Sequence, residues 1–300
     1  MAAEGRRDLT GGVLTAMAAV LFGAIVTIGR SEGVRDVPVT ALLSIRFATA
    51  AAALALFLTI GRQPLLPARG EGRRLVALGA LGYGVEATFF FLALGRGTAA
   101  TVTLLFYTYP VWVALLSAAF GMGLPGMLVG GSLVAAVAGS GVVVASSGGL
   151  DIVALGIAFA LASAVTIAFF LIGLEALVHR TSPLASSMWI ALSASAALGM
   201  FAVASGTGRF PTWPDEWMPI VTMGVLTSGA FWLLFLGVRR LGAVRASIIS
   251  SLEPVAAAAL ALLFLGELLR AGVLLGGLLI LGGAVAASLA RGVREPEAGP

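Results

Sequence analysis

The chain has 300 residues, of which 59% are hydrophobic and only 11% charged, with a mean hydropathy of +1.06 and a formal net charge of +4 at pH 7. This composition excludes a water-soluble domain with one apolar core and predicts a protein that lies in a lipid bilayer. The lack of cysteine and the single histidine exclude disulfides and thiolate or multi-histidine metal sites, so no cofactor or metal is expected.

Ten apolar stretches follow one another, each close to the ~20 residues that a membrane-spanning helix needs. Arg6 and Arg7 precede the first stretch as in a secretory signal, but no small-residue cleavage site leads into a polar domain. This stretch is therefore also predicted to be a membrane helix. The expected fold is an all-α polytopic membrane protein, with spans at 12–29, 39–60, 75–95, 98–120, 126–147, 153–177, 184–204, 217–238, 243–264 and 271–290.

The distribution of arginine predicts the orientation in the membrane. All 18 basic residues are arginine: twelve fall on the side of the N-terminus, five on the opposite side, and Arg46 lies within a span. Because basic residues concentrate in cytoplasmic loops, both termini are predicted to be cytoplasmic. The arginines are scattered singly or in pairs, which is typical of membrane topology and argues against a nucleic-acid partner.

An internal repeat relates the two halves of the chain. The stretch 94–110 recurs as 236–254, and an offset of 144 positions aligns Arg96 with Arg240 and Pro110 with Pro254. Each repeat, 1–149 and 150–300, contains five spans. Because five is odd, the second unit must cross the membrane in the opposite direction to the first, so the sequence predicts an inverted repeat.

The last span of each half carries glycines four residues apart, Gly126 with Gly130 and Gly272 with Gly276. Such patterns let helix backbones approach closely where lipid supplies no hydrophobic driving force. Close packing inside one chain is the favoured interpretation, and association of two chains is the alternative. A monomer or a homodimer is therefore expected.

Three ionisable residues lie well inside predicted spans: Arg46, Glu86 and Glu253. A charge at the bilayer centre costs about 2.5–3.5 kcal/mol on insertion scales, so such residues normally face a cavity or a partner. We interpret them as candidates for substrate charge recognition or for coupling. The alternatives are a structural ion pair, or a protonated glutamate hydrogen-bonded to a neighbour.

Aromatic side chains accompany these charges at helical spacing. Tyr83 and Phe90 share a helix face with Glu86, and Tyr109 and Trp112 form a second pair three residues apart. Together with Trp232 they are predicted to line a central cavity. The alternative is packing or contact with lipid, although tyrosine hydroxyls in mid-bilayer need polar partners.

Two prolines stand at equivalent places in the repeat, Pro110 and Pro254. Each removes a backbone donor, and Pro254 is expected to free the carbonyl of Ser250, next to Glu253. Broken helices at matching positions of inverted halves indicate a central binding site. Pro110 and Pro254 are therefore predicted hinges, and Ser250 a predicted cavity residue; a harmless kink is the alternative.

The motif Ser251-Leu252-Glu253-Pro254, followed by Leu265-Gly266-Glu267 and a glycine-rich last helix, resembles the drug/metabolite transporter (DMT) superfamily, specifically its EamA-type exporters. The ten spans in two related halves agree with this. The aromatic first half is similar to the YddG-like exporters of aromatic and neutral amino acids. The resemblance implies a multi-pass protein of the bacterial inner membrane. The first half lacks the two acidic motifs of the second.

We therefore expect a transporter, not an enzyme, that exports a small amphipathic metabolite by alternating access. The expected substrate is an amino acid with an apolar or aromatic side chain, with protons as a possible coupling ion at Glu86 or Glu253. Efflux of cationic drugs or another metabolite is the alternative. A membrane enzyme or a scaffold is less favoured, because the only histidine, His179, stands beside Arg180 at a helix end, without the clustered polar residues such enzymes need.

Overall fold

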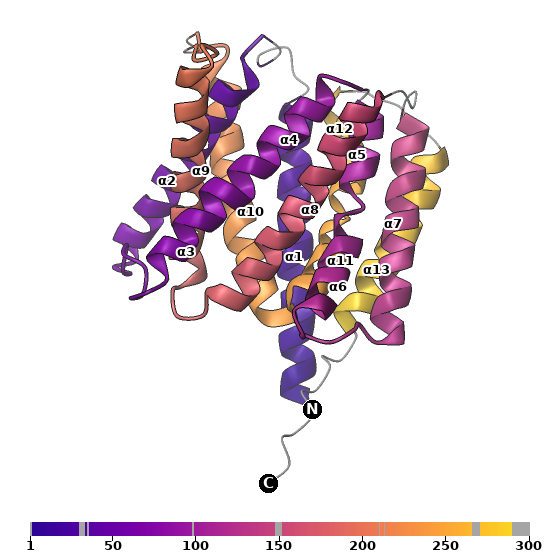
Figure 1. The fold of residues 1–300 in the computed structure, drawn as a ribbon. Helices are drawn as coiled ribbons and strands as arrows, with labels where there is room; N and C mark the ends of the chain where they lie inside the picture. The colour runs from indigo at the N-terminus through magenta and orange to yellow at the C-terminus, as the bar shows by residue number, and fades with distance from the viewer. Residues whose placement is uncertain are drawn as a thin grey trace.

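The computed structural model describes residues 2–29, 34, 36–97, 99–147, 152–209, 211–212, 214–265 and 271–289. Ten helical spans are long and apolar enough to cross a membrane, which confirms the predicted fold class (Figure 1). No strand occurs in these ranges, only an isolated bridge between Gly97 and Ile152. Glu267 lies outside the described residues.

Seven spans are single helices. Five of them surround the centre of the bundle. The other two, α7 and α13, pack against each other at its edge (Figure 1). Their bounds are α1 (Ala2–Ile28), α2 (Val39–Ile60), α7 (Met127–Ser147), α8 (Ala154–Leu177), α9 (Pro183–Ala204), α10 (Trp217–Leu241) and α13 (Ala271–Leu289).

The other three spans are interrupted. The fourth consists of α5 (Ala99–Phe106) and α6 (Tyr109–Ala119), and the ninth of α11 (Ala243–Ser250) and α12 (Glu253–Leu265). The third, which follows an oblique path in Figure 1, consists of α3 (Gly72–Ala77), the π-helix η2 (Leu78–Gly84) and α4 (Val85–Leu94).

The breaks in the fourth and ninth spans have the same local geometry. The amide of Thr108 donates to the carbonyl of Leu105 at 3.2 Å, and 144 residues later the amide of Leu252 donates to Ile249 at 3.1 Å. These tighter bonds end each helix just before its proline. Pro110 and Pro254 then occupy the first turn of the next helix, where the missing N–H costs nothing. The two interruptions therefore follow from the prolines.

The π-helix was not predicted. Its wider turns coincide with three glycines in six residues, at positions 79, 82 and 84. A Cβ on Gly79 would lie 2.5 Å from the carbonyl oxygen of Ile190, so glycine is needed there for α9 to approach. π-Helical turns are frequent at functional sites, and this one directly precedes α4, which carries Glu86 in its first turn.

The packing of the last spans corrects part of the sequence interpretation. A Cβ on Gly276 would lie 2.4 Å from the carbonyl oxygen of Gly139, and one on Gly272 would lie 2.5 Å from Cβ of Ser146, so α13 packs closely against α7. A Cβ on Gly126 or Gly130, in contrast, would meet no atom of another described element within 4 Å. On α7, therefore, a different glycine makes the approach, because the two helices meet along another face.

Replacing Gly276 with valine is expected to lower the free energy of unfolding by about 1–3 kcal/mol or more, because the new side chain meets backbone atoms that cannot rotate away. Gly130→Val is the matched control, since it makes the same change of residue where an added Cβ would meet no atom of another described element within 4 Å. Unfolding in detergent measures both. Equal losses of stability in the two variants would contradict the close α7–α13 contact.

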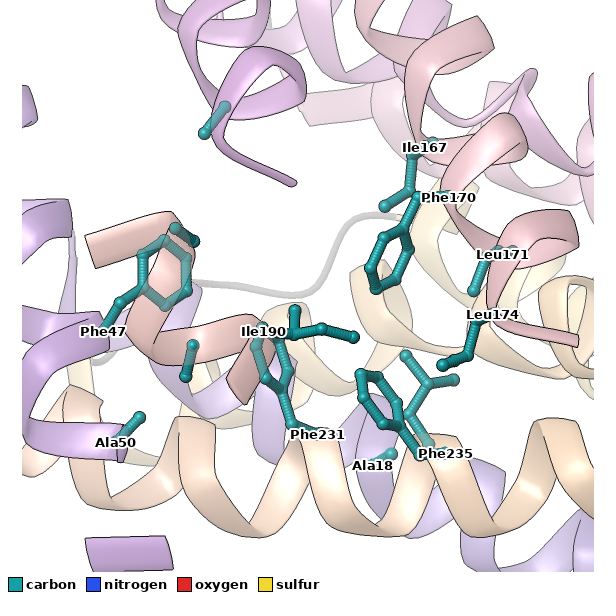
Figure 2. Packing of buried hydrophobic residues seen from close by; sticks show 14 of the residues in the cluster. Ala18, Phe47, Ala50, Ile167, Phe170, Leu171, Leu174, Ile190, Phe231 and Phe235 are labelled. Atoms are coloured by element: carbon teal, nitrogen blue, oxygen red, sulfur yellow. The ribbon is translucent and has the colours of Figure 1, made fainter. Parts of the chain in front are cut away.

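The apolar core lies among α1, α2, α8, α9 and α10. Phe231 and Phe235 project from one face of α10 and stack at 5.7 Å between ring centroids (Figure 2). Phe47 of α2 lies 5.9 Å from Phe231, and Phe170 of α8 lies 6.1 Å from Phe235. These aromatic contacts join the two halves and form a wall beside the polar residues described next.

Candidate functional site

Arg46 is held at the contact between α2 and α10. Its Nε donates to Oγ1 of Thr227 at 2.7 Å, and its guanidinium carbon lies 5.1 Å from the ring centroid of Phe47. Gly224, one turn before Thr227, permits this approach, since a Cβ there would lie 2.8 Å from the carbonyl oxygen of Arg46. Its position is therefore fixed, while its other two guanidinium nitrogens make no hydrogen bond to the described residues.

Two carboxylates lie near this cation. Arg46 interacts electrostatically with both Glu86 and Glu253, yet no direct ion pair joins it to either within the described part of the chain. The site therefore holds one cation and two acids that do not neutralise each other by contact. A ligand carrying charges of both signs can fit such an arrangement.

Glu86 is buried in α4, with 7% of its surface exposed. The hydroxyl of Ser163, from α8, donates to its Oε1 at 2.9 Å. This bond satisfies one acceptor and ties the acid of the first half to a helix of the second. Among the described residues none bonds to Oε2, so this oxygen can take a substrate group or a proton.

Glu253 is the first residue of α12, directly after the break in the ninth span. The N-terminus of a helix carries a partial positive charge that favours a carboxylate. The side chain of Tyr107, from the break in the fourth span, hydrogen-bonds to Glu253. The two interruptions thus meet through a polar contact.

Tyr109 makes a second link between the broken spans. The amide of Ser251 bonds to Ile248, one residue short of the α-helical partner, and this leaves the carbonyl of Ser247 without its helical bond. The hydroxyl of Tyr109 donates to that carbonyl at 3.2 Å, and the hydroxyl of Ser251 also reaches it. The side chain of Ser250 also lies close to the Tyr109 hydroxyl.

Two groups of aromatic rings flank these polar residues. Tyr83 of η2 lies 5.4 Å from Phe47, 5.4 Å from Phe170 and 5.0 Å from Phe231 between ring centroids, all near edge-to-face. In the second group, Phe106 contacts three rings. They are those of Phe90 at 5.3 Å, Tyr107 at 5.6 Å and Tyr109 at 5.4 Å.

Of the five aromatic residues predicted to line the cavity, three belong to these two groups of rings and two do not. Tyr83, Phe90 and Tyr109 belong to the groups. Trp112 of α6 is half-buried and packs against the core cluster. Trp232 is 42% exposed on the outer side of α10, and its neighbour Phe231 is fully buried. The structure thus places Trp232 away from the polar centre, because adjacent residues on a helix point in different directions.

Sequence reasoning missed the polar partners Thr227 and Ser163 and the aromatic residues Phe231 and Phe235. The last two stand four apart, which predicts one helix face, and they follow Thr227 by four and eight residues. That spacing was a usable signal for a functional face on α10. Ser163 carried no comparable signal.

A polar clasp closes the end of the bundle that carries the loops 61–71 and 178–182. Glu71, which is 4% exposed, accepts hydrogen bonds from three successive backbone amides, those of His179, Arg180 and Thr181, and from the Thr181 hydroxyl. Arg239 donates to the carbonyls of Thr181 and His179. The clasp therefore joins both halves and the end of α10.

The clasp keeps Glu71 ionised. Burial alone would raise the pKa of this carboxyl, but the hydrogen bonds from the Thr181 side chain and from the three amides outweigh burial and lower the pKa to about 2. A folded-state pKa below the usual value of 4.5 stabilises the fold at all pH values above about 4.5. That contribution is lost as the pH falls towards 2.

We expect Glu71→Gln to lower the free energy of unfolding at pH 7 by about 3 kcal/mol, the equivalent of this pKa shift. The difference from the parent protein should shrink below pH 4.5 and vanish near pH 2. Unfolding in detergent at pH 7, 4.5 and 3 measures it, with Asp215→Asn at an exposed position as a control for surface carboxylates. A difference that does not change with pH would contradict the clasp.

The comparisons with known proteins agree with this architecture. A family model described as the EamA-like transporter family matches residues 10–145 and again residues 154–289. A solved crystal structure is similar over 92% of this chain and 96% of its own, with a TM-score of 0.80 and 19% sequence identity, a level that shows the fold alone. No curated protein sequence matches the chain.

Proposed function

Because this chain belongs to the EamA-like transporter family, we propose that it moves an amino acid with an apolar or aromatic side chain through the centre of the helix bundle. The observation that supports this most is the group formed by Arg46 on α2, Glu86 on α4 and Glu253 at the break in the ninth span, beside two sets of aromatic rings. A free amino acid carries one charge of each sign and a side chain, and the site offers a partner for each.

Arg46 is proposed to bind the substrate carboxylate. Its Nε is already engaged by Thr227, so the guanidinium is held in place while its remaining nitrogens can face a ligand. Glu86 is proposed to bind the ammonium group, since Ser163 fixes one of its oxygens. The rings around Tyr83 and Phe106 would then hold the substrate side chain. This is the activity expected of an exporter similar to the YddG-like proteins.

Alternating access is proposed to use the two breaks as hinges. The half-helix α11 is fixed at its start, where the amide of Ala243 donates to Glu175 at 2.7 Å, and Arg245 pairs with Asp8 at 3.1 Å. Movement at residues 251–252 would therefore carry α12 and Glu253 relative to α11. The same movement at residues 107–108 would shift α5 relative to α6, and so open the other side.

The direct test is uptake of radiolabelled phenylalanine by proteoliposomes, with and without a pH gradient. Uptake above that of empty liposomes supports the proposal, and a larger uptake with the gradient supports proton coupling. No movement of phenylalanine, leucine or tryptophan under either condition would contradict it. Protease protection of a C-terminal tag in bacterial spheroplasts tests the proposed inner-membrane location with cytoplasmic termini.

A second candidate, efflux of lipophilic cations, is favoured by the excess of acids over bases at the site. Two carboxylates stand against one guanidinium that is already hydrogen-bonded, and aromatic faces attract cations. Competition separates the two functions. If tetraphenylphosphonium is transported and phenylalanine does not inhibit it, the cation proposal replaces the amino acid proposal.

A further inference from the structure

Two apolar grooves run along either side of the third span, on the outer surface of the bundle. The first, about 560 Å³, lies between this span and α8 and is lined by residues that include Arg74, Leu78, Phe169 and Leu177. The second, about 530 Å³, lies towards Trp189 of α9 and is lined mainly by apolar residues. Arg73, Ala77 and Leu81 line both grooves and form the ridge between them.

Each groove begins at charged residues and continues among exposed apolar ones. Arg73 and Arg74 are exposed near the start of a membrane span, whereas Leu81, two turns further on, is 67% exposed and Phe169 is 48% exposed. In a bilayer the apolar residues contact acyl chains, and the arginines lie at the level of lipid headgroups. Trp189, whose Nε1 donates to the carbonyl of Leu65, marks the same interfacial level.

The charge of the two arginines is not neutralised by the described part of the chain. Arg74 donates to the backbone carbonyl of Leu177 at 3.3 Å, across the mouth of the first groove, and neither arginine forms an ion pair with a described carboxylate. The nearest acid in sequence, Glu71, is turned to the backbone of residues 179–181. Two positive charges therefore lie at the headgroup end of the two apolar grooves.

We propose that this surface binds one anionic diacyl phospholipid, with its phosphate on Arg73 and Arg74 and one acyl chain in each groove. Charge complementarity favours an anionic over a zwitterionic lipid, as in other basic sites between membrane helices. The two grooves share the same headgroup end, which fits a ligand with two chains. The arginines stand on α3 and the apolar lining continues along η2, and the proposal requires no assumption about the transported substrate.

The test is the thermal stability of the purified full chain in neutral detergent with added phosphatidylglycerol, compared with phosphatidylcholine of the same acyl chains. Phosphatidylglycerol is expected to raise Tm by about 3 °C or more above phosphatidylcholine. The double variant R73Q/R74Q should lose most of this difference. R62Q/R69Q, which removes the same charge from exposed positions outside the grooves, should keep it.

Two further arms separate the contributions of charge and chains. Inorganic phosphate at the same concentration should give no increase in Tm. Ala77→Trp places a large side chain between the grooves and keeps both arginines, so it should reduce the increase in Tm from phosphatidylglycerol. Native mass spectrometry counts the bound lipid in every variant that folds. Equal effects of the two lipids, equal losses in the two double variants, or a full increase with phosphate alone would each overturn the proposal.

Discussion

Arg46→Ala is expected to reduce the initial rate of phenylalanine uptake at least about 100-fold at low substrate concentration. Removing one partner from a buried set of charges costs about 3–5 kcal/mol, and 1.4 kcal/mol corresponds to a tenfold change in affinity. The variant also leaves Glu86 and Glu253 without the cation with which both interact. Uptake into proteoliposomes at matched protein content measures the effect.

Arg46→Lys should be intermediate, because it keeps the charge but loses the bond from Nε to Thr227 and the planar fork of donors. Arg96→Ala is the matched control: this arginine is tied to its own helix through the carbonyl of Leu92 and lies over Phe159, away from the site. If Arg46→Ala takes up phenylalanine at the rate of the parent protein, Arg46 does not bind the substrate and the prediction is wrong.

Glu253→Gln is expected to abolish accumulation driven by a pH gradient while leaving exchange of substrate across the membrane. A gradient of one pH unit is worth about 1.4 kcal/mol per proton, which corresponds to about tenfold accumulation for one coupled proton. Glu253 is the better candidate for that proton because it stands at a break and hydrogen-bonds to Tyr107 at the other break. A change in its charge therefore acts on both hinges.

Glu86→Gln provides the comparison for this variant. Its amide can still accept a hydrogen bond from Ser163, so the variant should weaken substrate binding but keep the response to the gradient. The two variants should thus separate binding from coupling. Gradient-driven accumulation that persists in Glu253→Gln and disappears in Glu86→Gln would reverse the proposed roles.

The ten spans and the positions of two breaks were predictable because their signals are local. Apolar length identifies a span, and a proline identifies the place where helical bonds must end. The π-helix had no equivalent signal, since the glycines at 79, 82 and 84 permit it without requiring it. The α7 glycine that contacts α13 was missed for another reason: Gly139, Gly126 and Gly130 all have the same type of sequence neighbourhood, and only packing selects among them.

The charged residues of the site were found because a charge inside a bilayer is costly wherever it stands. Their partners were not found, because Thr227 and Ser163 are distant in sequence and resemble many other hydroxyl residues of this chain. The choice between Phe231 and Trp232 depended on the rotation of α10 about its axis. Because α10 has apolar residues on every side, hydrophobicity gives no signal for that rotation, and the spacing of Thr227, Phe231 and Phe235 was the signal that remained.

The central claim is that substrate binds where the two broken spans meet, and the chain has no cysteine, which makes a direct test possible. Ser250→Cys would place a single thiol beside Tyr109, and Ser205→Cys a single thiol on an exposed loop as the control. Both are labelled in proteoliposomes with a charged thiol reagent, with and without phenylalanine. We expect phenylalanine to slow labelling at position 250 and not at position 205. Unchanged labelling at position 250 by a substrate that the same proteoliposomes transport would contradict the proposed site.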